Sequence, residues 1–333
     1  MQSQTLSTNL RVRPLAILAI LLGSIFGVSA HGAEGSFERT LAVTGPVEID
    51  VSTGSGHVNV RAGASSNVHI AGTIKASKSW HLDEGEAERK VRYLESNPPI
   101  EQHGNFIRIG RIEDHELSHN ISISYDLVVP AQTRLRSQTG SGSQSVEGIQ
   151  GPVRASTGSG SVKVENIGDE VRAETGSGDV EVNSVKGTTH ASTGSGSIHA
   201  SGIGSSFVAS TGSGSIKLEQ AGPGDGKVET GSGSVELQNV RGALRVRTGS
   251  GNITAQGEPT GEWSLHTGSG RVLVRLPSAA AFELNAHTSS GHISTDHPIT
   301  VQGTIGRGEL RGKVRGGGPI LELETGSGNI QIE

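Results

Sequence analysis

The sequence predicts an all-β protein, specifically a parallel β-solenoid (β-helix) with about 18 residues per coil and one short helix inserted near its N-terminal end. Three observations support this fold class. The tetrapeptide Thr-Gly-Ser-Gly returns with a nearly constant period, the apolar residues on either side of it alternate, and 50 of the 333 residues are glycine. A fixed period of this kind is the sequence signature of a repeat architecture.

The tetrapeptide marks the period along the chain. Its copies begin at Thr53, Thr139, Thr157, Thr175, Thr193, Thr211, Thr230, Thr248, Thr267 and Thr325. A softened copy, Thr288-Ser289-Ser290-Gly291, precedes the last one by about twice the usual spacing. We interpret that gap as two periods whose shared boundary has decayed to Ile305-Gly306-Arg307-Gly308. This interpretation places successive copies on successive coils.

The apolar residues flanking each tetrapeptide are two apart, which is the period of a strand rather than of a helix. In one repeat the alternation covers residues 171–175 and resumes at Val180 and Val182. The parity changes across the tetrapeptide, so it must form a corner or a bulge, where glycine supplies unusual backbone angles. Each repeat is therefore predicted to be two short strands with a second bend near Asn183-Ser184, and the coils stack because one alone cannot bury its apolar side chains.

The start of the chain predicts export. An apolar run at residues 14–28 follows two arginines and ends in the small-residue cleavage site Val28-Ser29-Ala30, so residues 1–30 are a predicted signal peptide. A retained anchor is the alternative, but the run is shorter than the roughly 20 residues that a membrane span needs. The predicted location is the periplasm, the cell surface or the extracellular space, and the protein is predicted not to be integral to the membrane.

Composition excludes several classes of protein. No cysteine is present, so neither disulfides nor thiolate metal sites are available. The net charge of −5 is small for 333 residues and argues against nucleic acid as a partner.

Two regions follow the predicted signal peptide: irregular N-terminal coils with a helical insertion at residues 31–130, and a regular β-solenoid at residues 131–333. The helix is predicted at residues 83–96, where Asp83 and Glu86 form a capping box. Its apolar face consists of Ala87, Val91 and Leu94. We expect this helix to cover the N-terminal end of the solenoid, because a terminal repeat needs a polar cover.

These features together resemble the bacterial putative-adhesin β-solenoid family, an exported domain of unknown function. The resemblance is carried by residues 37–43, by residues 125–130 and by the serial motif Thr-Gly-Ser-Gly-x-[Val/Ile]-x-[Val/Leu]. It implies a solenoid fold and brings no established catalytic residues. The chain departs from the family by its regularity, and only Asp179 stands where the family motif often has Asp.

The segment His115-Glu116-Leu117-Ser118-His119 matches the HExxH zinc motif. That motif needs a sustained helix that places both histidines on one face. Here an alternating strand pattern follows His119 almost at once, and no apolar helical face precedes the motif. We therefore predict no metal site and no cofactor, with a loop histidine pair that binds adventitious metal as the alternative.

Other activities fit the sequence less well. A phosphate loop would need a lysine and a helix after the tetrapeptide. Ice binding would need outward threonines, whereas each Thr shares its parity with the inward residues and is expected to bond a corner amide. A carbohydrate-active β-helix enzyme is the alternative reading, because outward carboxylates exist at Glu147, Glu165, Glu181 and Glu219. No catalytic pair in a cleft is evident among them, so the chain is predicted not to be an enzyme.

One column of residues predicts a binding surface. Three residues before the threonines stand Arg136, Arg154, Arg172, His190, Val208, Lys227 and Arg245, all with outward parity. Stacking places members of a column about 4.8 Å apart. In one interpretation these cations pair with Glu174, Glu229 and other nearby acids. In the other they bind a linear polyanion, such as an acidic polysaccharide or lipopolysaccharide phosphates.

The predicted function is that of a non-enzymatic adhesin-like or scaffold protein of the bacterial cell envelope that binds anionic glycans. Its predicted partners are an envelope polysaccharide or another envelope protein. A periplasmic protein-interaction module that recognises its partner through an exposed strand edge is a further alternative.

Overall fold

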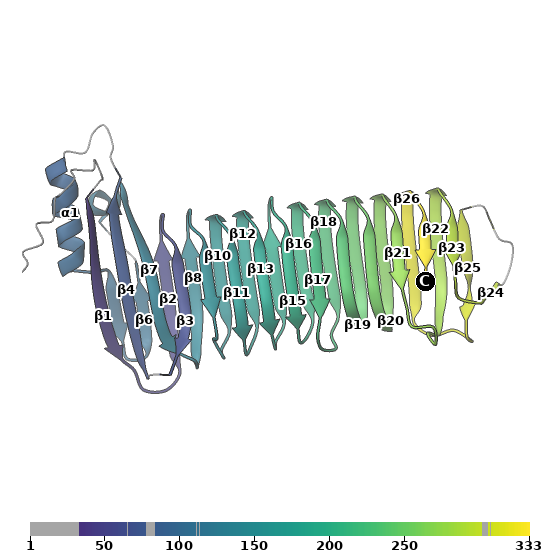
Figure 1. Cartoon of the computed structure of the whole chain (residues 1–333), viewed down its shortest axis with the longest axis horizontal. Helices are drawn as coiled ribbons and strands as arrows, with labels where there is room; N and C mark the ends of the chain where they lie inside the picture. Colours follow the sequence, from purple (N-terminus) through teal and green to yellow (C-terminus); the bar gives the residue numbers. More distant parts are fainter. Residues whose placement is uncertain are drawn as a thin grey trace, which may run out of the picture. The chain divides into compact units, whose positions relative to one another are not determined.

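The computed structural model describes residues 33–64, 66–77, 84–110, 112, 114–301, 306 and 308–333. The predicted signal peptide lies outside these residues, as do Asp83 of the predicted capping box and Ile305 and Arg307 of the predicted boundary. Within the unit Gly32–Glu333 the strands form one long, mostly parallel sheet that winds into stacked coils (Figure 1). This confirms the all-β class and the solenoid, while the boundaries at residues 30 and 130 stay predictions.

Among the described residues, seven strands and two helices precede the regular array. The strands are β1 (Glu34–Ala42), β2 (Val47–Thr53), β3 (Val58–Gly63), β4 (Asn67–Ala76), β5 (Ile100–His103), β6 (Phe106–Ile109) and β7 (Ile121–Pro130), and the helices are α1 (Glu84–Ser96) and α2 (His115–Ser118).

The array itself consists of pairs of strands, one before and one after each corner. The strands are β8 (Thr133–Thr139), β9 (Gln144–Glu147), β10 (Val153–Ser159), β11 (Val162–Ile167), β12 (Val171–Ser177), β13 (Val180–Val185), β14 (Thr189–Thr193), β15 (Ile198–Ile203), β16 (Phe207–Ser213), β17 (Ile216–Gln220), β18 (Gly226–Ser232), β19 (Val235–Ser250), β20 (Ile253–Ser269), β21 (Val272–Arg275), β22 (Phe282–Ser290), β23 (Ile293–Thr295), β24 (Ile299–Val301), β25 (Glu309–Val314), β26 (Ile320–Ser327) and β27 (Ile330–Ile332).

One coil shows how the sequence pattern becomes structure. In β12 and β13 the alternating residues are buried, and the buried parity changes at the corner between the strands. Gly178 at this corner has φ +147°, and Ser184 at the second bend has φ +57°. Val182 is register partner of Val164 on one side and of Ala200 on the other. The predicted columns, corner and second bend are therefore confirmed.

The buried threonines form a ladder of hydrogen bonds between coils. Thr157 Oγ1 donates to the carbonyl oxygen of Gly142 at 2.9 Å, and Thr175 Oγ1 donates to that of Gly160 at 2.7 Å. The inward orientation was predicted, and the corner group that each hydroxyl bonds is a carbonyl rather than an N–H. Each bond joins a coil to the neighbour on its N-terminal side, so the repeated Thr satisfies a corner carbonyl that would otherwise lack a partner.

The N-terminal end is closed by strands that do not follow the repeat. β2 and β3 stack directly on β8 and β9, so that Thr53 is register partner of Thr139. The other strands of this region form the antiparallel pairs β1–β4, β4–β7 and β5–β6, and β5 was not predicted. α1 packs against β1 and β4 and buries the predicted face of Ala87, Val91 and Leu94. Figure 1 shows α1 at this end, as expected.

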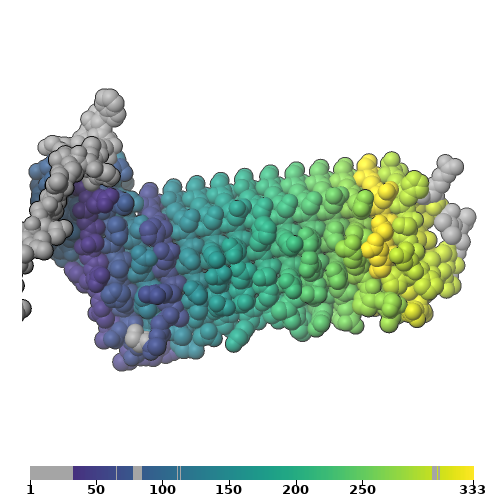
Figure 2. Space-filling model, viewed as in Figure 1, coloured from purple at the N-terminus to yellow at the C-terminus, as the bar shows by residue number. Residues whose placement is uncertain are grey.

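At the C-terminal end the predicted stacking order is wrong. β26 pairs in parallel with β20 on one side and with β22 on the other, so Thr325 lies between Thr267 and Thr288. The threonine ladder follows the same order, since Thr325 Oγ1 donates to Gly270 and Thr288 Oγ1 donates to Gly328. In Figure 2 the yellow C-terminal residues accordingly form a stripe between greener ones.

The gap between Thr288 and Thr325 is therefore not a decayed pair of periods. After β22 and β23 the chain forms β24 and β25, which pair antiparallel with each other, and β25 also pairs antiparallel with β22. The chain then returns past β22 to place β26 and β27 in the remaining position. We call β26 and β27 the closing coil.

Disulfide mapping tests this order, and the absence of native cysteine makes the readout simple. Ser269 and Ser327 are register partners, so the double variant S269C/S327C is expected to form an intramolecular disulfide. S269C/S290C is expected to stay reduced, because Ser327 separates these two positions and puts them roughly 9.6 Å apart. Mass spectrometry of the oxidised variants detects the disulfide. A disulfide in S269C/S290C but not in S269C/S327C would instead support stacking of the coils in sequence order.

Candidate functional site

The basic residues identified from the sequence lie on the outer side of the strands that precede the threonines. We call the following set the basic rank: Arg136, Arg154, Arg172, His190, Lys227 and Arg245. The strand register pairs each member with the next, except where Val208 stands between His190 and Lys227. His190 is half-buried and the other members are exposed. The structure thus brings all six into one line along the stack.

Carboxylates neutralise part of the basic rank. Arg172 Nε donates to Glu174 Oε1 at 2.7 Å, and Arg154 Nη2 lies 3.7 Å from Glu174 Oε2. Lys227 Nζ lies 3.1 Å from Glu229 Oε1. The pairing interpretation therefore applies to three members. Exposed ion pairs of this kind contribute about 0 to 1 kcal/mol, so they resist a competing anionic ligand only weakly.

Two of the arginines have no such partner. Among the described residues, neither Arg136 nor Arg245 forms an ion pair or a side-chain hydrogen bond. Arg136 lines a groove of about 480 Å³ together with Arg134, Arg154 and Arg172. Arg134 was not predicted as part of this surface, although its outward parity two residues before Arg136 is a signal that identifies it. The groove therefore holds four guanidinium groups on three successive coils, and the carboxylates of Glu48, Asp50 and Glu170 also line it.

Acidic residues limit the length of the basic rank. At its N-terminal end Asp50 is the register partner of Arg136. At the other end Arg245 is paired with Ser264, and Ser264 is paired with Glu322 of the closing coil. The positively charged segment is thus confined to the coils between these carboxylates.

His190 adds a charge that depends on pH. Burial lowers the pKa of His190 below its ordinary value of 6.5, the positive charge of Arg172 lowers it further, and Glu174 acts in the opposite direction. His190 is consequently neutral at pH 7 and becomes cationic only in acid.

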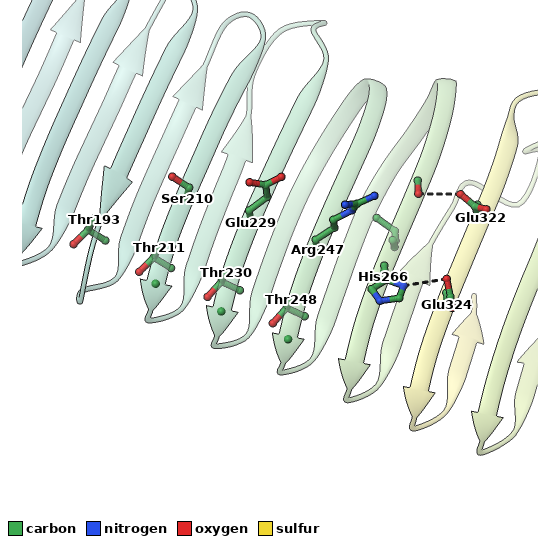
Figure 3. Close-up of a pocket in the computed structure, with 15 residues that line it drawn as sticks. Thr193, Ser210, Thr211, Glu229, Thr230, Arg247, Thr248, His266, Glu322 and Glu324 are labelled. Carbon is green, nitrogen blue, oxygen red and sulfur yellow. Dashed lines mark hydrogen bonds and ion pairs between the residues drawn. The ribbon is translucent and has the colours of Figure 1, made fainter.

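A second hollow, of about 960 Å³, lies on the same side of the strands farther along the stack (Figure 3). Arg247 lies there between Glu229 and His266, which are its register partners on the neighbouring coils. His266 Nδ1 lies 3.0 Å from Glu324 Oε2 of the closing coil. This hollow is lined by both carboxylate and guanidinium groups rather than by charges of one sign.

The hollow does not assemble a nucleophile with its base. Ser264 and His266 are two residues apart on β20, and Ser264 donates to Glu322 Oε2 at 3.0 Å while His266 bonds Glu324. Nucleophilic catalysis by serine needs a hydrogen bond from the hydroxyl to the base. The two residues therefore bridge β20 to the closing coil.

The outward carboxylates of the enzyme alternative lie on the strands that follow the corners. Lys163 Nζ lies 3.1 Å from Glu165 and 3.7 Å from Glu181. The hydrogen bond from Lys163, together with one from Asn183, lowers the pKa of Glu165. A glycosidase acid needs a raised pKa, so Glu165 does not suit that role.

The HExxH segment forms only one helical turn. α2 was not predicted, and Asp114 caps it by accepting the backbone N–H groups of Glu116 and Leu117 at 2.9 and 3.2 Å. His119 lies beyond the helix in an extended conformation, so the two histidines do not share a helical face. In the part of the chain that the structure describes, no group of three His, Asp or Glu is arranged to hold a metal ion.

The fold and this surface define a parallel β-solenoid with a Thr-Gly-Ser-Gly corner in its coils and the basic rank on the strands that precede the corners. The family model of Toastrack DUF4097 matches residues 46–333, so the chain belongs to that family. This confirms the resemblance inferred from the motifs. No curated protein matches the chain, and no helix among the described residues has the length and apolar character that a membrane span requires.

Solved structures give more distant similarities. A putative cell adhesion protein from Clostridium sporogenes is 12% identical, with 90% of this chain and 99% of that chain covered and a TM-score of 0.21. A putative adhesin from Bacteroides fragilis is 12% identical, with 90% and 97% covered and a TM-score of 0.31. A putative lipid binding protein from Parabacteroides distasonis is 13% identical, with 90% and 97% covered and a TM-score of 0.36.

Proposed function

We propose that this protein is a non-enzymatic, exported, adhesin-like or scaffold protein of the bacterial cell envelope that binds linear anionic glycans along the basic rank. The observation that carries the proposal is the groove lined by Arg134, Arg136, Arg154 and Arg172, in which the four guanidinium groups outnumber the three carboxylates. Guanidinium groups in register about 4.8 Å apart suit a polymer that presents acidic groups repeatedly. A linear ligand engages several coils at once, so weak single contacts add up.

Removing three members of the rank tests the proposal. The variant R136S/R154S/R172S is expected to bind dextran sulfate roughly 100-fold more weakly, because three exposed contacts of about 1 kcal/mol each are lost. Its melting temperature should stay close to that of the wild type, since these side chains are exposed. Calorimetric titration at several salt concentrations also gives the slope of affinity against salt, which should become shallower by roughly one unit per contact.

A matched control removes the same charge elsewhere. K75S/K217S/R311S changes three exposed cations outside the basic rank and should leave binding nearly unchanged. Equal losses of affinity in both triple variants would show that binding depends on net charge alone and not on the basic rank. A wild-type protein that binds no anionic glycan at low salt would refute the proposed function.

Binding should also depend on pH through His190. As pH falls below 6.5 this residue gains a proton beside Arg172, so affinity for dextran sulfate is expected to rise about two- to fivefold between pH 7.5 and pH 5. Without ligand the sign reverses: the lowered pKa of His190 contributes stability above pH 6.5 that is lost as pH falls. The comparison is with H190Q, which should lack this part of the pH dependence. Identical profiles of affinity against pH for the two proteins would show that His190 does not contribute to binding.

A further inference from the structure

We propose that the position of the closing coil is an exchange site, in which the closing coil of a second copy takes the place of the chain's own. Two copies that insert their closing coils into each other form a dimer. The inference does not depend on glycan binding, because it rests on the strand order and on the segment that leads into β26.

The contacts of the closing coil do not require that it belong to the same chain. β26 and β27 pair with β20 and β21 on one side and with β22 and β23 on the other. Side-chain bonds repeat this pattern, since Thr325 bonds Gly270 and Arg275 Nε donates to Glu333 at 2.9 Å. A second copy offers the same register and the same partners, so exchange preserves these contacts.

The monomer and the exchanged dimer differ in the linker that leads into the closing coil. β25 lies on one side of β22 and β26 on the other, so Arg315-Gly316-Gly317-Gly318-Pro319 must cross the start of β22. Connections that cross at one edge of a sheet are rare. Here the linker contacts the segment that leads into β22: Arg315 Nε and Nη2 donate to the carbonyl oxygen of Ser278 at 3.2 and 3.0 Å.

The linker also contains an unfavourable backbone conformation. Arg315 has φ +53°, which is uncommon for a residue other than glycine, and Gly316 and Gly317 have φ +89° and +93°. An extended linker that reaches a second copy needs neither the tight turn nor the crossing of its own β22. Short hinges under strain favour exchange of the element that they carry.

Two single-cysteine variants test exchange directly. S269C and S327C chains are unfolded together, refolded at high concentration and oxidised. Because Ser269 and Ser327 are register partners, a disulfide-linked dimer of the two different chains is expected when a closing coil has entered the other copy. The control mixture of S250C with S327C should give no such product, because Ser269 is the register partner of both positions and keeps them roughly 9.6 Å apart.

A linker variant tests the cause. Arg315→Val puts a β-branched residue at φ +53° and removes the side-chain hydrogen bonds to the carbonyl oxygen of Ser278, so it penalises the tight turn, which an extended linker to a second copy does not need. The ratio of dimer to monomer in size-exclusion chromatography should rise by roughly tenfold or more, and the mixed disulfide yield should rise with it. If R315V fails to fold, the mixture with the native linker still decides. No mixed disulfide there, or equal yields from S250C and S269C, would overturn the proposal.

Discussion

Val182→Asp is expected to lower the free energy of unfolding by about 4 to 7 kcal/mol at neutral pH. Val182 is fully buried between Val164 and Ala200, so the new carboxylate has no water and no cation within the column. Full burial raises the pKa of a carboxyl group by about 3 to 5 units, and each unit corresponds to about 1.4 kcal/mol. The measurement is urea unfolding followed by circular dichroism.

Two observations separate charge from shape in this experiment. Val182→Asn introduces nearly the same shape as Val182→Asp without the charge, so its loss of stability relative to the wild type should be independent of pH. With Asp the folded-state pKa lies above the unfolded value, so the penalty is small near pH 4 and grows as pH rises. Coils depend on their nearest neighbours, and limited proteolysis should therefore cut between residues 160 and 205. An unchanged proteolysis pattern would contradict the column alignment.

Gly178→Val is expected to cost about 3 to 5 kcal/mol, because it combines backbone strain with a steric clash. Gly178 has φ +147°, and a Cβ atom there would lie 2.3 Å from the carbonyl oxygen of Gly160. That carbonyl is the acceptor of the Thr175 hydroxyl, so it cannot move without loss of a ladder bond. Thermal unfolding compares the variant with the wild type.

The matched control is the neighbouring residue. Ser177 is exposed and has no side-chain hydrogen bond among the described residues, so Ser177→Ala should change stability by about 0.5 kcal/mol or less. Gly178→Ala tests whether any Cβ atom is sufficient to disturb the corner. Equal melting temperatures for G178V and S177A would show that the corner tolerates a side chain.

Most of the solenoid could be predicted because each coil repeats the same local pattern. Alternation on either side of Thr175 determined which residues face inward, and the parity change located the corner at Gly178. The apolar face of α1 followed from helical spacing. All of these features are local in the sequence. A strand or a helix by itself fixes how often successive side chains return to the same face.

The features that could not be predicted depend on contacts between distant segments. Thr267, Thr325 and Thr288 carry equivalent flanks, so their sequences do not say which coil lies beside which, and sequential stacking is the usual arrangement. The partition of the basic rank into paired Arg172 and unpaired Arg136 depends on side-chain geometry at neighbouring coils. The close approach of backbones at Gly178 needs the position of the preceding coil.

The irregular strands at both ends of the array have an evolutionary consequence. Interior coils such as β12 and β13 make the same register contacts with each neighbour, whereas both caps are formed by strands outside the repeat. Duplication or loss of one repeat in the interior therefore alters neither cap nor the pairing around it. Each such event moves the caps apart or together by about 4.8 Å. Selection can thus adjust the reach of the protein, and the number of charges it presents, by copy number alone.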